Sequence, residues 1–242
     1  MFNIIFIIGG PGVGKGTQCS LLVKEWPTKF VQISLGDILR DEQDKPDSKW
    51  RETLQKNLKE GLIGSKEMVV DLLQDKLEEL NEQDKHKVIL LDGKPDWYLM
   101  IGDNDNVTGF PRTINRCVLF EERICKPAGC VLLKASEDIL RQRLRGGARD
   151  DDHKSTVDKR LEVWQQESGE VVEHYRSQGL LVEVDAEGEK GEVLRELEKE
   201  LAKKVRVVGF FLIGRGRSRS AGEEDGKEVA DGDSLSRRVT PG

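Results

Sequence analysis

The sequence has few of the residues that build metal centres and disulfide frameworks. Its 242 residues include only four cysteines and three histidines. No two cysteines have the Cys-x-x-Cys spacing that is typical of zinc and redox sites, and the histidines are scattered. The pattern argues against a metal site built from thiolates or imidazoles. It predicts small, buried thiols in a reducing compartment.

The sequence also lacks long apolar runs and an excess of basic residues. No apolar stretch approaches the roughly 20 residues that a membrane-spanning helix needs. The formal net charge of −6 gives no support to nucleic-acid binding, because nucleic-acid-binding proteins usually present a basic face. The first predicted strand starts at residue 2, which would leave no room for a targeting peptide before it. We therefore expect a cytoplasmic protein, with the nucleus as a second location, whose partners include neither membrane nor nucleic acid.

Short apolar runs alternate with helical patterns along most of the chain. Runs rich in β-branched and aromatic residues predict strands at 2–8, 30–34, 88–92, 131–133 and 180–184. Apolar spacing predicts helices at 19–25, 136–145, 155–177 and 190–204, a charged helix from Asp37, and small helices within 41–60. Another helix is predicted to begin with a capping residue at Ser65. Strands that alternate with helices predict an α/β fold with a parallel sheet, whose ligand lies at the carboxyl ends of the strands.

Residues 9–18 carry the most specific local pattern, Gly-Gly-Pro-Gly-Val-Gly-Lys-Gly-Thr-Gln, between a predicted strand and a predicted helix. The spacing Gly9-x4-Gly14-Lys15 fits a phosphate-binding loop. Glycines let backbone N–H groups turn inward around phosphate oxygens, and the lysine can reach the β- and γ-phosphates. A plain glycine-rich turn and a dinucleotide-binding fold are the alternatives, and Lys15 argues against both. The loop therefore predicts nucleotide binding.

Arginines recur just beyond the predicted strand ends. Phosphoryl transfer needs cations against the phosphate oxygens, and it needs little covalent chemistry from the protein. Each arginine alone could be a solvated surface charge, but the set indicates a phosphoryl-transfer site: Arg40, Arg112, Arg143, Arg145, Arg149 and Arg160. Asp92 ends a predicted strand, where a carboxylate can hold Mg²⁺ directly or through water.

Taken together, these motifs resemble those of the nucleoside monophosphate kinase family, and most closely its short-lid UMP/CMP kinases and cytosolic adenylate kinases. The similar segments are Gly9–Gln18, Ser34–Arg40, Asp92-Gly93 resumed as Phe110-Pro-Arg112, Arg149–Asp152 and Lys159-Arg160. The resemblance covers about residues 2–188 without the segment 94–109. It implies a P-loop NTPase-type, doubly wound sheet of five parallel strands, a monophosphate-binding flap at about 35–65 and a short lid at about 145–153.

The resemblance also implies roles for the residues at matching positions. Those implied to bind ATP are Gly10, Gly12, Val13, Gly14, Lys15, Gly16 and Thr17, with Arg143 stacking on the base. Those implied to hold the acceptor monophosphate are Ser34, Arg40, Ile63, Arg112 and Arg116. Lys15, Arg112, Arg149 and Arg160 would stabilise charge during transfer. Asp92 would hold Mg²⁺ through water, and the protein would be a monomer.

The segment 94–109 separates the two halves of one family motif. Its removal restores the uninterrupted sequence Leu-Leu-Asp-Gly-Phe-Pro-Arg. Its sixteen codons would preserve the reading frame. Both edges can be encoded by splice-site-like sequences, so one hypothesis is a translated intron. A genuine loop with adjacent ends is the rival. Residues 205–242 turn rich in glycine, serine and charge, and we interpret them as a disordered or non-native tail after a kinase domain at 1–204.

Two further departures from the family pattern concern the acceptor. Arg116 stands where family members usually carry a glutamine that reads the acceptor base, and its side chain can only donate hydrogen bonds. Leu35 replaces a small or hydroxyl residue beside Gly36. The expected reaction is phosphoryl transfer from ATP with Mg²⁺ to UMP or CMP. AMP as the acceptor and an ATP-binding protein with impaired catalysis are the alternatives.

Overall fold

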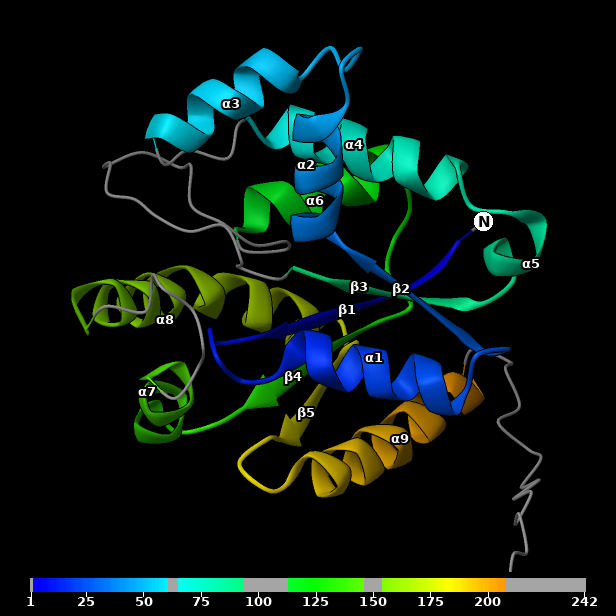
Figure 1. Cartoon of the computed structure of the whole chain (residues 1–242). Coiled ribbons are helices and arrows are strands. Elements are labelled where there is room, and N and C mark those ends of the chain that lie inside the picture. The colour runs from blue at the N-terminus through cyan, green and yellow to red at the C-terminus, as the bar shows by residue number, and fades with distance from the viewer. Residues whose placement is uncertain (1, 61–64, 94–112, 146–153, 208–242) are drawn as a thin grey trace, which may run out of the picture. The chain divides into compact units, whose positions relative to one another are not determined.

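The computed structural model describes residues 2–60, 65–93, 113–145 and 154–207. The chain divides into the units Met1–Phe211 and Leu212–Gly242, and the second unit lies outside the described residues. Figure 1 labels the elements of the first unit, which are β1 (Asn3–Gly9), α1 (Lys15–Glu25), β2 (Phe30–Ser34), α2 (Leu35–Asp44), α3 (Arg51–Glu60), α4 (Lys66–Glu78), α5 (Glu82–Lys85), β3 (Val88–Asp92), α6 (Ile114–Arg123), β4 (Gly129–Lys134), α7 (Glu137–Arg145), α8 (Lys154–Ser177), β5 (Leu181–Asp185) and α9 (Lys190–Val207).

The five strands form one parallel sheet in the order β2-β3-β1-β4-β5. All five residues of β3 are buried, as expected for a strand covered on both faces. The chain leaves β1 toward one edge of the sheet and later crosses to the other edge, so the order reverses beside β1. The carboxyl ends of strands at such a switch point are where doubly wound folds bind ligands. The predicted parallel α/β sheet is confirmed.

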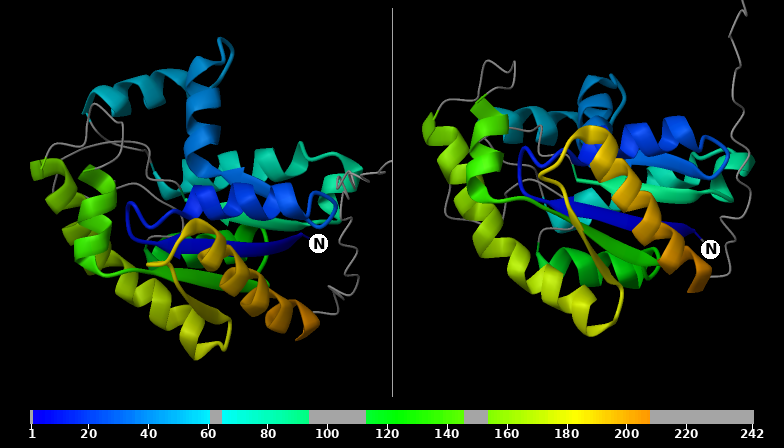
Figure 2. Two further views of the ribbon diagram at one scale, coloured as in Figure 1. Left: turned by 60° about the horizontal axis from the view of Figure 1, so that its bottom comes forward. Right: turned by 90° about the horizontal axis from the view of Figure 1, so that it is seen from below.

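Helices cover both faces of the sheet (Figures 1 and 2). α1 and α9 pack together on one face, where α1 contacts β1, β2 and β3 and α9 contacts β5. α4, α6 and α8 pack on the other face. Alternate residues of β1 point to opposite faces. Ile4, Phe6 and Ile8 join a core cluster with residues of α4 and α6, and Phe6 makes edge-to-face contacts with Phe120 and Tyr175.

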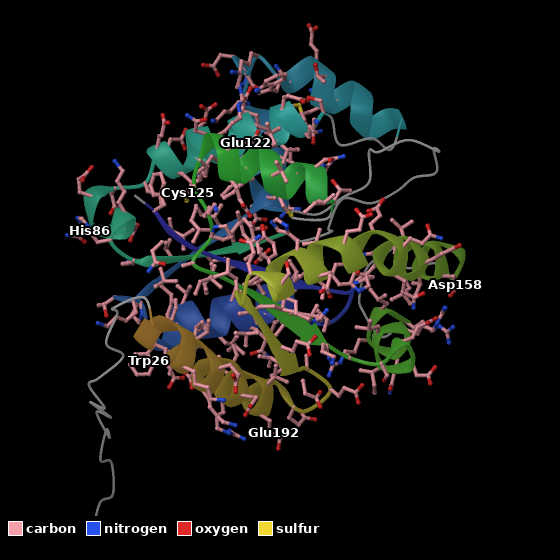
Figure 3. All side chains as sticks on the ribbon, turned by 180° about the vertical axis from the view of Figure 1, so that it is seen from behind. Trp26, His86, Glu122, Cys125, Asp158 and Glu192 are labelled. Atoms are coloured by element: carbon pink, nitrogen blue, oxygen red, sulfur yellow. The ribbon has the colours of Figure 1, made fainter. Side chains whose placement is uncertain are left out.

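Polar contacts fix two of the helix positions. Ser65 caps α4, because its side chain accepts a hydrogen bond from the Met68 N–H, which confirms the predicted capped start. Trp26, at the end of α1, lies against α9 and donates from Nε1 to Glu198 at 2.6 Å (Figure 3). Among the described helices, none combines the length and the apolar character that crossing a membrane requires.

Several predicted boundaries were wrong by a few residues. The charged helix begins at Leu35 and not at Asp37, because Leu35 turns into the core, where it is 2% exposed, while Ser34 serves as the N-cap. The β1, β4 and β5 strands end one residue later than predicted, since Gly9, Lys134 and Asp185 still pair with neighbouring strands. The segment 41–60 holds the end of α2 and one helix, α3, and α9 runs to Val207.

Candidate active site

The loop between β1 and α1 has backbone conformations that require glycine. Gly12 has φ 79° and Gly14 has φ 98°, both in the left-handed region that other residues rarely adopt. Gly14 is the N-cap of α1, so the first N–H groups of that helix point toward the loop. Val13 is buried, as is Gly16, whereas Thr17 is exposed. The loop therefore has the form of an anion site at a helix N-terminus.

Helices α7 and α8 pack directly onto this loop. A Cβ atom added at Gly12 would lie 2.9 Å from Leu144 Cγ, and one at Gly10 would lie 2.8 Å from Leu140 Cδ1 and 3.4 Å from Trp164 Nε1. The two helices are themselves joined, because Arg141 of α7 pairs with Asp158 of α8. Figure 2 shows both helices at the side of the sheet where the loop after β1 lies. The loop is thus held between the sheet and the helices that flank residues 146–153.

Lys15 turns its ammonium back along the loop. Its Nζ donates to Gly9 O at 2.7 Å and to Gly10 O at 3.1 Å, and the residue is only 7% exposed. A buried ammonium is costly unless it is hydrogen-bonded. The two carbonyls therefore hold a positive charge beside the N–H groups of α1, where the phosphates of a nucleotide are expected.

The polar ends of β2 and β3 lie in register with the end of β1. Asp92 pairs with Ile7 on one side and with Ser34 on the other, so the three residues form one row across neighbouring strands, two residues before Gly9. Asp92 is fully buried and accepts a hydrogen bond from the Gln32 amide. The Ser34 hydroxyl is buried, does not cap α2 and has no hydrogen-bond partner among the described residues. The row places a carboxylate and a hydroxyl beside the phosphate-binding loop.

The predicted arginines occupy different environments. Arg40 is half-buried on α2 and pairs with Asp37, one turn earlier on the same helix. Arg116 is 3% exposed on the first turn of α6, which is a rare environment for a guanidinium. Arg160 is half-buried on α8.

Arg143 faces the loop that follows β5. Its guanidinium donates to the Ala186 carbonyl at 2.7 Å and the Glu187 carbonyl at 2.9 Å, with a longer contact to Gly188 at 3.4 Å. The same region contacts α1, because Gln18 Nε2 donates to the Lys190 carbonyl at 3.1 Å. Arg143 thus joins α7 to the segment beside the N-terminus of α9.

Several predicted site residues lie outside the described residues. They are Ile63, Arg112 and Arg149, together with the segment 94–109 and the lid residues 146–153. Their predicted roles stay predictions.

Gln32 and Ser20 join the site although the sequence did not single them out. Ser20 Oγ donates to Gln32 Oε1 at 3.0 Å, and Gln32 in turn contacts Asp92, so a polar chain links α1, β2 and β3. The one available signal was a glutamine inside the otherwise apolar run Phe-Val-Gln-Ile. Its partner could not be found from sequence, because Asp92 lies sixty positions further along the chain.

The sheet order and the loop together define a P-loop nucleotide-binding protein. A sequence model of the AAA domain family matches residues 8–158. The uridylate kinase of Schizosaccharomyces pombe is 33% identical over 205 residues, which cover 83% of this chain and 98% of that protein. The uridylate kinase of Saccharomyces cerevisiae is 30% identical over 200 residues, covering 81% and 89%. The UMP-CMP kinase of Xenopus tropicalis is 32% identical over 202 residues, covering 81% and 94%.

The chain therefore belongs to the nucleoside monophosphate kinase family, and the resemblance drawn from its motifs is confirmed. Members of this family are phosphotransferases that use ATP and act on nucleotides.

Proposed function

We propose that this chain transfers a phosphoryl group from ATP to UMP or CMP, giving ADP and the corresponding diphosphate. The observation that carries the proposal is the row Ile7, Asp92 and Ser34 beside the phosphate-binding loop. It supports the proposal because a carboxylate and a hydroxyl lie next to a loop with the form of a phosphate site. Relatives named uridylate kinase and UMP-CMP kinase support a pyrimidine acceptor over AMP.

The donor half of the proposed site is the loop with α1. Lys15 and the first N–H groups of α1 would hold the β- and γ-phosphates of ATP, so that the γ-phosphoryl group points toward Asp92 and Ser34. Arg143 would stack on the base, as the resemblance implies, next to the loop after β5 that its guanidinium contacts. Arg149 and Arg160 would neutralise charge on the phosphoryl group as it moves.

The acceptor half is β2 with the helices that follow it. The buried Ser34 hydroxyl would donate to the acceptor phosphate, because such a group gains a partner from a ligand oxygen. Arg40 and Arg112 would pair with that phosphate, while Ile63 and Arg116 would contact the nucleoside. The buried carboxylate of Asp92 fits a role in holding Mg²⁺ through water. Mg²⁺, when bound, would supply neutralising charge at the phosphate oxygens.

A coupled assay for ADP formation tests the proposal with UMP, CMP, AMP and GMP at matched concentrations. We expect the highest kcat/KM with UMP or CMP, and dependence on ATP and Mg²⁺. A preference for AMP would overturn the pyrimidine assignment.

The segment 94–109 favours a second candidate, an ATP-binding protein with impaired transfer, because it separates Asp92 from Arg112 along the chain. Tight ATP binding without ADP formation in the presence of any acceptor would support this candidate.

A further inference from the structure

A chain of two hydrogen bonds ends on the buried carboxylate of Asp92. Gln32 lies in the middle of β2 and donates from Nε2 to Asp92 Oδ2. Its other amide atom, Oε1, accepts from Ser20 Oγ at 3.0 Å. Ser20 belongs to α1, the helix that begins at the phosphate-binding loop. These two hydrogen bonds therefore connect the donor half of the site to the end of β3.

The two bonds together fix which way the Gln32 amide faces. A carboxylate accepts hydrogen bonds and cannot donate them, so Asp92 requires the NH₂ end of the amide. The carbonyl end then needs a donor, and the serine hydroxyl can rotate to supply one. Reversing the amide would set two acceptors against each other at Asp92.

The burial of Asp92 makes this contact important. The side chain is 0% exposed, and a buried carboxylate is costly unless it is hydrogen-bonded. A donor from Gln32 stabilises the ionised form and holds one carboxylate oxygen in place. Carboxylates that hold metals are usually fixed by outer partners of this kind, and loss of such a partner typically weakens metal affinity by about 10- to 100-fold.

We propose that Gln32 is a positioning residue that orients Asp92 toward the Mg²⁺ accompanying ATP, with Ser20 fixing the Gln32 amide. The inference rests on the proposed function, which assigns Asp92 to the Mg²⁺ shell. The inference itself concerns the contact between Gln32 and Asp92, and Gln32 need not touch either nucleotide.

The test compares nucleotide binding with and without Mg²⁺, so it does not depend on turnover. The full-length protein and its variants are titrated with a non-hydrolysable ATP analogue by calorimetry, first with Mg²⁺ and then with a chelator. Gln32→Met keeps the length of the side chain and removes both amide contacts. Ser20→Ala removes only the bond that orients the amide, and Asp92→Asn is the reference. Thermal unfolding of each variant reports whether the fold persists.

We expect Gln32→Met to reduce the Mg²⁺-dependent gain in affinity by up to about 10-fold, because Asp92 reaches the ion through water, while affinity in chelator stays unchanged. Ser20→Ala should have a smaller effect of the same kind, since Ser20 is exposed. Combined with Asp92→Asn, Gln32→Met should cause no further loss.

Two results would contradict the inference about Gln32 alone. A purely structural role for Gln32 would lower affinity equally with and without Mg²⁺, and this result would overturn the inference. If Asp92→Asn alters the Mg²⁺ dependence and Gln32→Met does not, the inference fails and the proposed function stands. If Asp92→Asn has no effect, the metal assignment fails, and the inference fails with it.

Discussion

At the scale of single residues, Lys15 carries a charge that its own loop stabilises. Its ammonium is bonded to the carbonyls of Gly9 and Gly10, which keep the side chain close to the N–H groups of α1. The lysine therefore needs little reorganisation to meet a phosphate. Preorganised charge of this kind is what phosphoryl transfer requires from a protein.

Lys15→Met should abolish turnover and weaken ATP binding while the fold persists. Methionine keeps an unbranched side chain of similar length, but it cannot donate to a phosphate. A lost charge-assisted hydrogen bond of about 1.5–3 kcal/mol corresponds to roughly 10- to 100-fold weaker binding. Calorimetric titration with ATP measures the loss, and circular dichroism checks the fold. Lys24→Met, an exposed position on the same helix, is the matched control and should bind like the wild type. Wild-type affinity in Lys15→Met would contradict the assignment of the loop.

Gly12→Ala should destabilise the protein and weaken ATP binding. An added Cβ would lie 2.9 Å from Leu144 Cγ and 3.2 Å from Leu140 O, at a residue whose φ is 79°. We expect a loss of about 1–3 kcal/mol in the free energy of unfolding, because backbone strain and a contact with α7 act together. Gly169→Ala is the control, since a Cβ there meets no atom within 4 Å and alanine favours the helix by about 1 kcal/mol. Urea unfolding should give a lower free energy of unfolding for Gly12→Ala and a higher one for Gly169→Ala. An unchanged value for Gly12→Ala would show that α7 shifts to make room for the added Cβ.

The conformations of Gly12 and Gly14 could be predicted from the local pattern, because a loop of this spacing between a strand and a helix requires glycine. The roles of these residues and of Lys15 in binding ATP stay predictions. The contacts of Gln32 and Arg143 were not predictable. Each joins segments that are far apart in the chain, and only the folded sheet brings them together.

At the scale of elements, α6 and α8 are joined by a partly buried polar cluster away from the phosphate-binding loop. Tyr175 on α8 donates from its hydroxyl to Glu121 on α6 at 3.1 Å, and His174 lies 3.3 Å from the same carboxylate. Burial raises the pKa of the Cys117 thiol from 9.0 to about 12, and burial likewise raises the pKa of Tyr175 above its usual value. The folded chain therefore keeps the protons of Cys117 and Tyr175 at alkaline pH values at which the unfolded chain releases them.

The stability of the protein should fall as the pH rises above 9. Between pH 9 and pH 12 the unfolded chain loses the Cys117 proton while the folded chain keeps it, so rising pH favours unfolding. One such proton contributes a slope of up to about 1.4 kcal/mol per pH unit. Cys117→Ala removes this contribution and should show a shallower decline. Urea unfolding at pH 8 to 10.5 under reducing conditions measures both slopes, and equal slopes would contradict the role of the thiol.

The bounds of two strands were predictable from the sequence. Residues 88–92 and 30–34 form β3 and β2 as predicted, because a short β-branched and aromatic run has no competing period. The start of α2 was wrong, since only the tertiary structure shows that Leu35 enters the core. The end of α9 at Val207 lies beyond the predicted position, because helical propensity there continues past the last apolar contact of the pattern.

At the scale of the whole molecule, the segment 94–109 lengthens the connection between β3 and α6. The connection from β3 to α6 comprises residues 93–113, which is 21 residues, whereas connections between a strand and the next helix usually have about 2–6. Removing sixteen residues leaves 21 − 16 = 5, within that usual range. We propose that residues 1–204 form the kinase domain, that residues 205–242 are an appended tail into which α9 continues as far as Val207, and that the segment 94–109 is dispensable for the fold.

Deleting residues 94–109 should therefore raise activity without harming the fold. The deletion joins Gly93 to Phe110, so that Arg112 follows Asp92 at the end of β3 by four positions in the shortened chain. Misplacing a catalytic group by about 1 Å can cost about 100-fold in rate, so we expect a gain of up to that size in kcat/KM for UMP or CMP. Deleting the last sixteen residues, 227–242, is the control of equal length and should leave kcat/KM unchanged. If the shortened protein binds ATP as before but no longer forms ADP in the presence of any acceptor, the segment belongs to the working site. A gain in activity would instead support the translated-intron hypothesis, and sequencing the mature transcript would then decide whether the segment belongs to the native protein.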